Sequence, residues 1–131
     1  MTDPSTGSGT GLPVVRELGR EECLRLLATA SLGRVVYTRA ALPAVEPVAF
    51  RVRGHDIVFR TRSGAVLAGV PGAVVAFQAD DVDPATWTGW SVVAVGEARE
   101  VPATAPPGPE PDGGRTVSIR AQRLTGWAAG R

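Results

Sequence analysis

The feature that most constrains this chain is a series of short segments in which apolar and polar residues alternate, each bounded by turn residues. Val48, Phe50 and Val52, for example, fall on one face of an extended segment, and the residues between them fall on the other. Segments of this kind, with turns roughly every ten residues, indicate a barrel or a sandwich, and a small chain closes a barrel to remove strand edges. The predicted strands are residues 34–39, 45–53, 56–61, 72–78, 90–101 and 115–124, with an acidic turn at 79–84 and a bulge or bend at Gly96.

Two helices are predicted beside these strands. Residues 20–30 carry apolar side chains at helical spacing, with Cys23 and Leu27 on the same face. A second, shorter helix is predicted at 63–70, after the third strand, with Ser63 as its N-cap. Both helices are too short to form a layer of their own, so the expected fold class remains mainly β.

The domain organisation follows from length and local composition. A chain of 131 residues suits one domain. We expect a Thr/Ser/Gly-rich disordered leader at 1–13, a single domain at 14–131, and a proline-rich loop within it at 102–114.

Composition excludes several function classes. All 14 basic residues are arginine, which excludes Schiff-base lysine chemistry and a P-loop lysine. The single Cys and single His exclude a disulfide within the chain and a Cys/His zinc site, so no metal is expected. A net charge of +1 argues against a nucleic-acid-coating protein, and no apolar run is long enough to span a membrane. A cytoplasmic protein with reduced Cys23 is the expectation.

The strand that runs into the short helix is the first candidate site. Backbone N–H groups at a helix start bind phosphate oxygens, and the hydroxyls of Thr61 and Ser63 would add donors. Arg60 and Arg62 would add guanidinium groups whose geometry suits phosphate. An ordinary solvated turn with two surface arginines is the alternative interpretation.

Two tryptophans within four residues form the second candidate. Trp87 and Trp90 flank Gly89, and an indole face is a good platform for a planar ligand such as a flavin. The alternative is that the pair fills a barrel end or a subunit interface. His55 is expected to be an exposed turn residue and Cys23 a small buried hydrophobe.

Three stretches in this order resemble the pyridoxamine 5′-phosphate oxidase-like family of small bacterial flavin-binding proteins. They are REECLRLLATASLGRVVYT at 20–38, LPAVEPVAFRVRGHDIVFRTRSG at 42–64 and VVAFQADDVDPATWTGWSVVAVGEAREV at 74–101, with a weaker return at 116–126. The resemblance implies the FMN-binding split barrel, which is a mainly β fold with a six-stranded barrel. It also implies a homodimer that binds a small-molecule ligand, with FMN in a groove between the two chains.

The resemblance also assigns roles to residues. It implies that the phosphate lies against the end of the third strand and the start of the short helix, and that the isoalloxazine ring lies against the second strand and the Gly-Trp-Ser-Val stretch. Arg34 is an additional candidate from the first strand. The implied cofactor-binding residues are Val48, Ala49, Phe50, Arg60, Thr61, Arg62, Ser63, Gly64, Trp90 and Ser91.

The chain departs from the family pattern at two positions. Val66 stands where a phosphate-binding lysine is common, and Ala49 stands where an asparagine is common. Two functions therefore stay open. One is an FMN-binding oxidoreductase-type protein, in which a Val66→Lys substitution is expected to tighten FMN binding. The other is a repurposed split barrel that binds a deazaflavin, a haem-derived molecule or a pathway-specific ligand instead.

Overall fold

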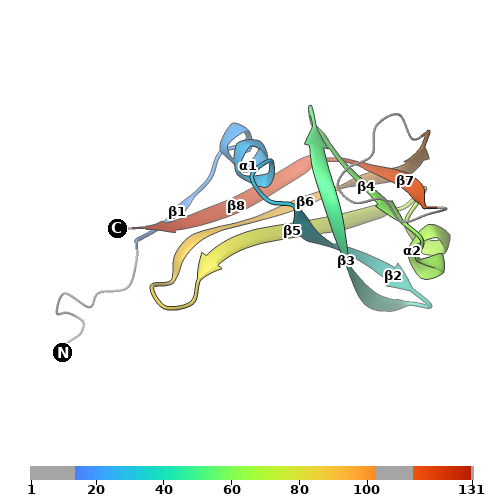
Figure 1. Cartoon of the computed structure of the whole chain (residues 1–131), viewed down its shortest axis with the longest axis horizontal. Helices are drawn as coiled ribbons and strands as arrows, with labels where there is room; N and C mark the ends of the chain where they lie inside the picture. The colour runs from blue at the N-terminus through green and yellow to red at the C-terminus, as the bar shows by residue number, and fades with distance from the viewer. Residues whose placement is uncertain (1–13, 103–113, 131) are drawn as a thin grey trace.

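The computed structural model describes residues 14–102 and 114–130, and in this part of the chain eight strands and two short helices are present (Figure 1). The predicted leader at 1–13 and nearly all of the predicted loop at 102–114 lie outside the described residues. The elements are β1 (Val14–Glu17), α1 (Arg20–Leu27), β2 (Leu32–Arg39), β3 (Leu42–Arg53), β4 (Asp56–Thr61), α2 (Gly64–Gly69), β5 (Val74–Asp83), β6 (Thr88–Val101), β7 (Arg115–Arg120) and β8 (Arg123–Gly130).

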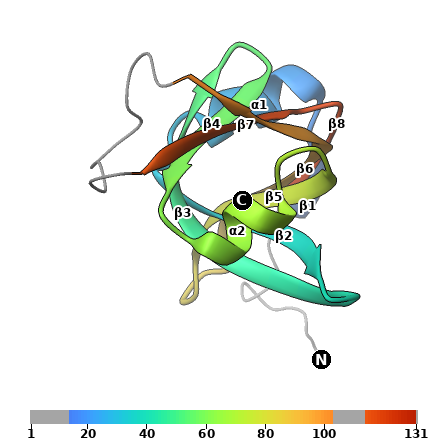
Figure 2. The same cartoon turned by 90° about the vertical axis from the view of Figure 1, so that its right-hand side faces the viewer.

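Six of these strands form a closed antiparallel barrel. Their order is β6-β5-β2-β3-β4-β7, and the ring closes because β7 also pairs with β6. Two further strands extend the sheet outside the barrel: β8 pairs with the first half of β6, and β1 pairs with β8. Figure 2 looks toward the end of the molecule at which α2 lies among the barrel strands. The predicted mainly β fold with a six-stranded barrel is therefore confirmed.

The strand β6 holds the barrel and the extension together because it changes partner along its length. Its residues 89–95 pair with β8, and its residues 98–101 pair with β7. Gly96 lies between the two ladders, and a Cβ atom there would fall 1.6 Å from the carbonyl oxygen of Arg120. The predicted bend at Gly96 thus coincides with the point at which the chain between β7 and β8 crosses β6.

Two strand boundaries differ from the sequence prediction. The predicted acidic turn at 79–84 is mostly strand, because β5 stays paired with β6 as far as Asp83. Ladder hydrogen bonds outweigh the poor strand propensity of aspartate here. The predicted strand at 115–124 is two strands, since Ala121 and Gln122 leave the β7 ladder: their amides donate to the carbonyls of His55 and Val95.

The first helix and the first strand also differ from expectation. The helix α1 ends at Leu27 rather than Ala30, because the amides of Thr29 and Ala30 bond to carbonyls three residues back and tighten the last turn. The strand β1 pairs with β8 and was not predicted, since its four residues show no alternation that could distinguish a strand. No helix among residues 14–102 and 114–130 is long and apolar enough to cross a membrane.

The core fills the barrel and continues beneath α1. Cys23 and Leu27 of α1 are fully buried, as the helical pattern predicts. At the centre of the barrel the rings of Phe50 and Phe77 meet edge to face, with centroids 4.7 Å apart. The fully buried side chains of largest volume are Phe59, Phe77, Leu27, Ile57, Ile119, Val35, Val66, Val70, Val92, Val117 and Cys23.

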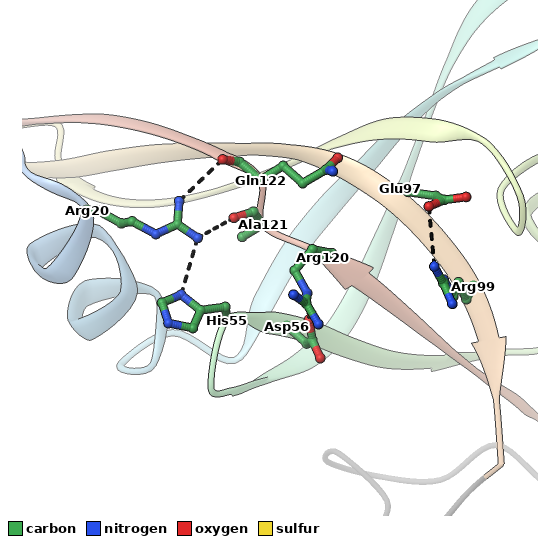
Figure 3. A network of polar contacts seen from close by, with 8 residues as sticks. All are labelled: Arg20, His55, Asp56, Glu97, Arg99, Arg120, Ala121 and Gln122. Carbon is green, nitrogen blue, oxygen red and sulfur yellow. Dashed lines mark hydrogen bonds and ion pairs between the residues drawn. The ribbon is translucent and has the colours of Figure 1, made fainter.

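Arg20 ties α1 to two distant turns (Figure 3). One guanidinium nitrogen donates to the carbonyl of Ala121 and to Nδ1 of His55, which lies 3.2 Å away in the β3–β4 turn. The other donates to the carbonyl of Gln122 at 3.4 Å. His55 is exposed, as predicted, and here its ring accepts a hydrogen bond that helps to fix the position of α1 on the barrel.

We predict that Gly96→Ala lowers the free energy of unfolding by at least about 2 kcal/mol, because its methyl group would collide with backbone rather than with a movable side chain. Urea unfolding followed by circular dichroism measures the change. Gly130→Ala is the matched control, since nothing lies within 4 Å of a Cβ atom at that position. Equal stabilities for the two variants would contradict the tight crossing at Gly96.

Candidate functional site

The junction between β4 and α2 is built largely by its own hydroxyl groups. Thr61, the last residue of β4, is buried, and its Oγ1 accepts a hydrogen bond from the amide of Ser63 at 3.0 Å. Ser63 Oγ accepts from the amide of Val66 at 3.2 Å, so Ser63 is the N-cap of α2, as predicted. Both hydroxyls therefore stabilise the junction. Arg62, which lies between Thr61 and Ser63 in the sequence, is exposed to solvent.

The charge at this junction is mixed. Ser63 Oγ also donates to Oε1 of Glu46 on β3 at 3.4 Å, so a carboxylate borders the position implied for a phosphate. Arg60 and Arg62 carry two positive charges beside it, and Arg60 also donates to the carbonyl of Gly114 at 3.1 Å. An anion bound here would be attracted by the two guanidinium groups and repelled by Glu46.

A groove of about 580 Å³ lies beside β3 and includes two of the implied ring-binding residues, Ala49 and Phe50. Its volume is in the range of small-molecule sites. The ring of Phe50 is buried in the core, and the backbone amide of Phe50 donates to the carbonyl of Ser31. Of the two residues, only Ala49 therefore has a side chain that faces the groove. The groove is lined by Ala28, Thr29, Ala30, Ser31, Leu32, Ala49, Phe50, Arg51 and Val52.

The β3–β4 ladder brings the groove and the junction to the same side of the barrel. Phe50 pairs with Phe59, and both are buried. Their neighbours Ala49 and Arg60 therefore both point away from the core, on adjacent strands. Val48, another implied ring-binding residue, is buried inside the barrel, so only its backbone lies near the outer face.

Trp90 and Ser91 lie far from this junction within one chain. They are near the start of β6, and Figure 1 shows the β5–β6 turn toward the opposite end of the long axis from α2. The Trp90 indole is 8% exposed and packs in the core, so it offers little surface to a planar ligand. For Trp90, burial agrees with the alternative interpretation, in which the tryptophan pair fills a barrel end or an interface. Trp87, in the β5–β6 turn, is exposed.

The sequence interpretation missed a polar chain on the outer face of β2, β5 and β6. Arg34 donates to Oε1 of Gln78 at 3.0 Å, and Nε2 of Gln78 donates to Asp80 at 2.8 Å and to Ser91 at 3.3 Å. Arg34 was a candidate, but nothing in the sequence joined it to Gln78, because their pairing depends on the β2–β5 register.

A second missed feature is the exposed indole of Trp127 on β8. Trp127 pairs directly with Ser91 of β6, and the two residues line a cavity of about 390 Å³ together with Val15 and Glu17 of β1. The signal in the sequence was an aromatic residue just past the last predicted strand, which ended at residue 124. An exposed indole is therefore present at this end of the sheet, and it belongs to Trp127 rather than to Trp90.

Val66, where the family commonly has a lysine, lies in the core. Its side chain is fully buried in the core beneath α2, so a residue at this position does not face the outer surface. A lysine at position 66 would have to leave the core to contact a phosphate, so the expected gain in FMN binding from Val66→Lys stays a prediction. The half-buried Ala65, one residue earlier, is closer to the surface.

Among residues 14–102 and 114–130, the remaining titratable groups supply neither an activated thiol nor a metal-binding cluster. Burial raises the pKa of the Cys23 thiol, with a further contribution from Glu22, so the thiol stays protonated and is a poor nucleophile. In the part of the chain that the structure describes, no group of three or more His, Cys, Asp or Glu side chains is placed to hold a metal ion.

The closed six-stranded barrel, with a short helix after its third strand and a groove along β3, defines this chain as a split-barrel protein. A sequence profile of the pyridoxamine 5′-phosphate oxidase family matches residues 19–107, more than half of the chain. The chain therefore belongs to this family, as the resemblance of its motifs indicated.

Individual relatives agree with this assignment. The uncharacterized protein Rv0080 of Mycobacterium tuberculosis is 52% identical over 93 residues, which are 66% of this chain and 61% of that protein. The chain thus spans about three fifths of that relative's length. Among solved structures, an FAD-binding protein of Mycobacterium smegmatis is 30% identical with a TM-score of 0.73, covering 90% of this chain and 100% of that one. A candidate pyridoxamine 5′-phosphate oxidase from Corynebacterium glutamicum is 29% identical with a TM-score of 0.72, covering 87% and 97%.

We predict that Val66→Lys lowers the free energy of unfolding by about 3–5 kcal/mol, because it buries a charge without a partner. Ala65→Lys, on the same turn of α2, should cost about 1 kcal/mol or less. Thermal or urea unfolding of the two variants gives the comparison. A Val66→Lys protein as stable as the parent would show that position 66 reaches solvent after all.

Proposed function

We propose that this chain binds a flavin nucleotide and functions as a flavin-dependent oxidoreductase-type protein. The resemblance implies FMN as the cofactor, and the relative from Mycobacterium smegmatis binds FAD. The observation that supports the proposal most directly is the position of the Ala49 groove beside Arg60, across one strand pair, in a chain of this family.

The residues fit such a ligand in charge and size. Arg60, Arg62 and the first turn of α2 would hold the phosphate, and the groove beside Ala49 would take the ring system. The exposed guanidinium of Arg62 replaces the lysine charge that the chain lacks. A bound flavin would supply the hydride or electron transfer itself, and the chain would bind it, orient it and keep water from one side of it.

We further propose that two chains associate through the outer face of β3, β2, β5, β6 and β8. This face carries exposed apolar side chains, which monomeric proteins rarely expose in such number. Association would also bring Ser91 and Trp127 of one chain toward the β4–α2 junction of the other, which a single chain keeps apart. The exposed apolar residues on this face include Leu32, Val45, Val74 and Trp127, and Val15 lies on the adjoining strand β1.

The alternative is a repurposed barrel that binds another small ligand. The specific observation in its favour is Glu46, whose carboxylate contacts Ser63 at the position implied for the phosphate. A deazaflavin, a haem-derived molecule or a pathway-specific compound would then occupy the groove. The absorption spectrum of the purified protein separates the two functions, since a flavoprotein is yellow.

We predict that Arg62→Ala weakens flavin binding about ten-fold or more, because one charge-assisted phosphate contact is lost. Quenching of flavin fluorescence on titration measures the dissociation constant. Arg39→Ala, an exposed arginine at the end of β2, is the control and should bind as the parent does. An unchanged constant for Arg62→Ala would place the phosphate elsewhere.

We predict that the parent elutes with about twice the 13.6 kDa mass of one chain, and that Val45→Glu shifts it toward a single chain. The new charge would be buried in the proposed interface, where it has no partner. Size-exclusion chromatography with light scattering measures the mass. Arg25→Glu, on the exposed face of α1, is the control. A parent protein with the mass of one chain would refute the interface.

A further inference from the structure

The strand register brings one indole and two carboxylates into a single row across the outer face of the sheet. Trp127 of β8 pairs directly with Glu17 of β1 on one side and with Ser91 of β6 on the other. Ser91 in turn pairs with Asp80 of β5. Residues that are directly opposite in adjacent strands point to the same side of a sheet. The four side chains therefore form a continuous row, in which the indole lies between Glu17 and Ser91.

The first three residues of this row line the cavity of about 390 Å³. The other residues that line it are small or apolar: Val15, Val93, Thr125 and Gly126. The indole of Trp127 is 39% exposed. The cavity therefore combines an apolar floor with an accessible aromatic ring, and its volume is in the range of small-molecule sites.

The carboxylate of Glu17 is available to a ligand in this cavity. The side chain forms no hydrogen bond or ion pair with any other residue that the structure describes in 14–102 and 114–130. The neighbouring Arg16 points to the opposite face of β1, where its guanidinium group pairs with Glu22 of α1 at 3.2 Å. Arg123, the arginine of β8, lies four residues from Trp127 and does not line the cavity. The cavity thus has a negative charge beside its indole and no arginine in its wall.

We infer that this cavity binds a small organic cation, and specifically an alkylated ammonium group. The negative face of the indole of Trp127 would attract the ammonium group, and the carboxylate of Glu17 would add a direct charge interaction. Methyl groups on the nitrogen would contact the apolar floor. They also weaken the hydration of the cation, so its removal from water costs less free energy than the removal of a primary ammonium group.

The cavity is distinct from the site proposed for a flavin. It shares no lining residue with the groove beside Ala49. It lies at the margin of the face proposed for association of two chains, since Glu17 is on β1, the last strand of the sheet (Figure 1). The residues that line it all belong to one chain, so cation binding should not require a second chain. The Val45→Glu variant should therefore bind the cation as the parent does.

The test compares three ligands by isothermal titration calorimetry: choline, its uncharged isostere 3,3-dimethylbutan-1-ol, and ethanolamine. The parent should bind choline about ten-fold or more tightly than either of the others, because the isostere lacks the charge and ethanolamine lacks the methyl groups. Trp127→Ala and Glu17→Gln should each weaken choline binding about five-fold or more. Trp87→Ala and Glu21→Gln are the matched controls, since each removes the same group at an exposed position outside the cavity.

The outcomes concern the cavity alone. The inference is overturned if the parent fails to bind choline, binds its isostere equally well, or binds no better than both cavity variants. Loss of choline binding in Val45→Glu would also overturn it, because the site would then need a second chain. Circular dichroism shows whether each variant is folded, and Glu17→Gln is a conservative change at an exposed position. Flavin titration is a separate measurement, so choline binding without flavin binding would refute the proposed function and leave this site in place.

Discussion

The pairing of β6 with two different strands is the constraint on which the rest of the structure depends. Its second half closes the barrel through β7, and its first half carries β8 and β1 outside it. The partner change needs a close crossing at Gly96, where no side chain fits. Because β6 is shared, the barrel interior and the extended outer face are parts of one continuous sheet and hold each other in register.

The position of the candidate site follows from this closure. Once β4 is paired on both edges, by β3 and β7, its end and the following helix α2 are fixed relative to β3. The hydroxyls of Thr61 and Ser63 are then used to make the turn into α2. In the proposed function, recognition of a ligand falls instead to arginines on the outer face of the barrel, of which Arg60 also donates to the carbonyl of Gly114.

Several features could be predicted from the sequence because they depend on local patterns. The alternation of apolar and polar residues predicted the strands of the barrel, and the helical spacing of apolar residues predicted the buried face of α1. The serine before the second helix predicted its N-cap at Ser63. Residues whose role depends on partners far along the chain could not be placed. Trp90, for which a ligand platform and a plug of the barrel end are both open from the sequence, is buried in the core, whereas the exposed Trp127 is not among the sequence candidates.

The sequence by itself determined the mainly β class, the arginine-only basic charge and the family motifs, since each is carried by neighbouring residues. Only the tertiary structure decided which faces of the strands point outward and which side chains meet across them. It buried Val66, joined Arg34 to Gln78, and placed Trp127 beside Glu17. The physical reason is that strand register and barrel closure are set by contacts between residues distant in sequence, and a shift of one residue would reverse every face.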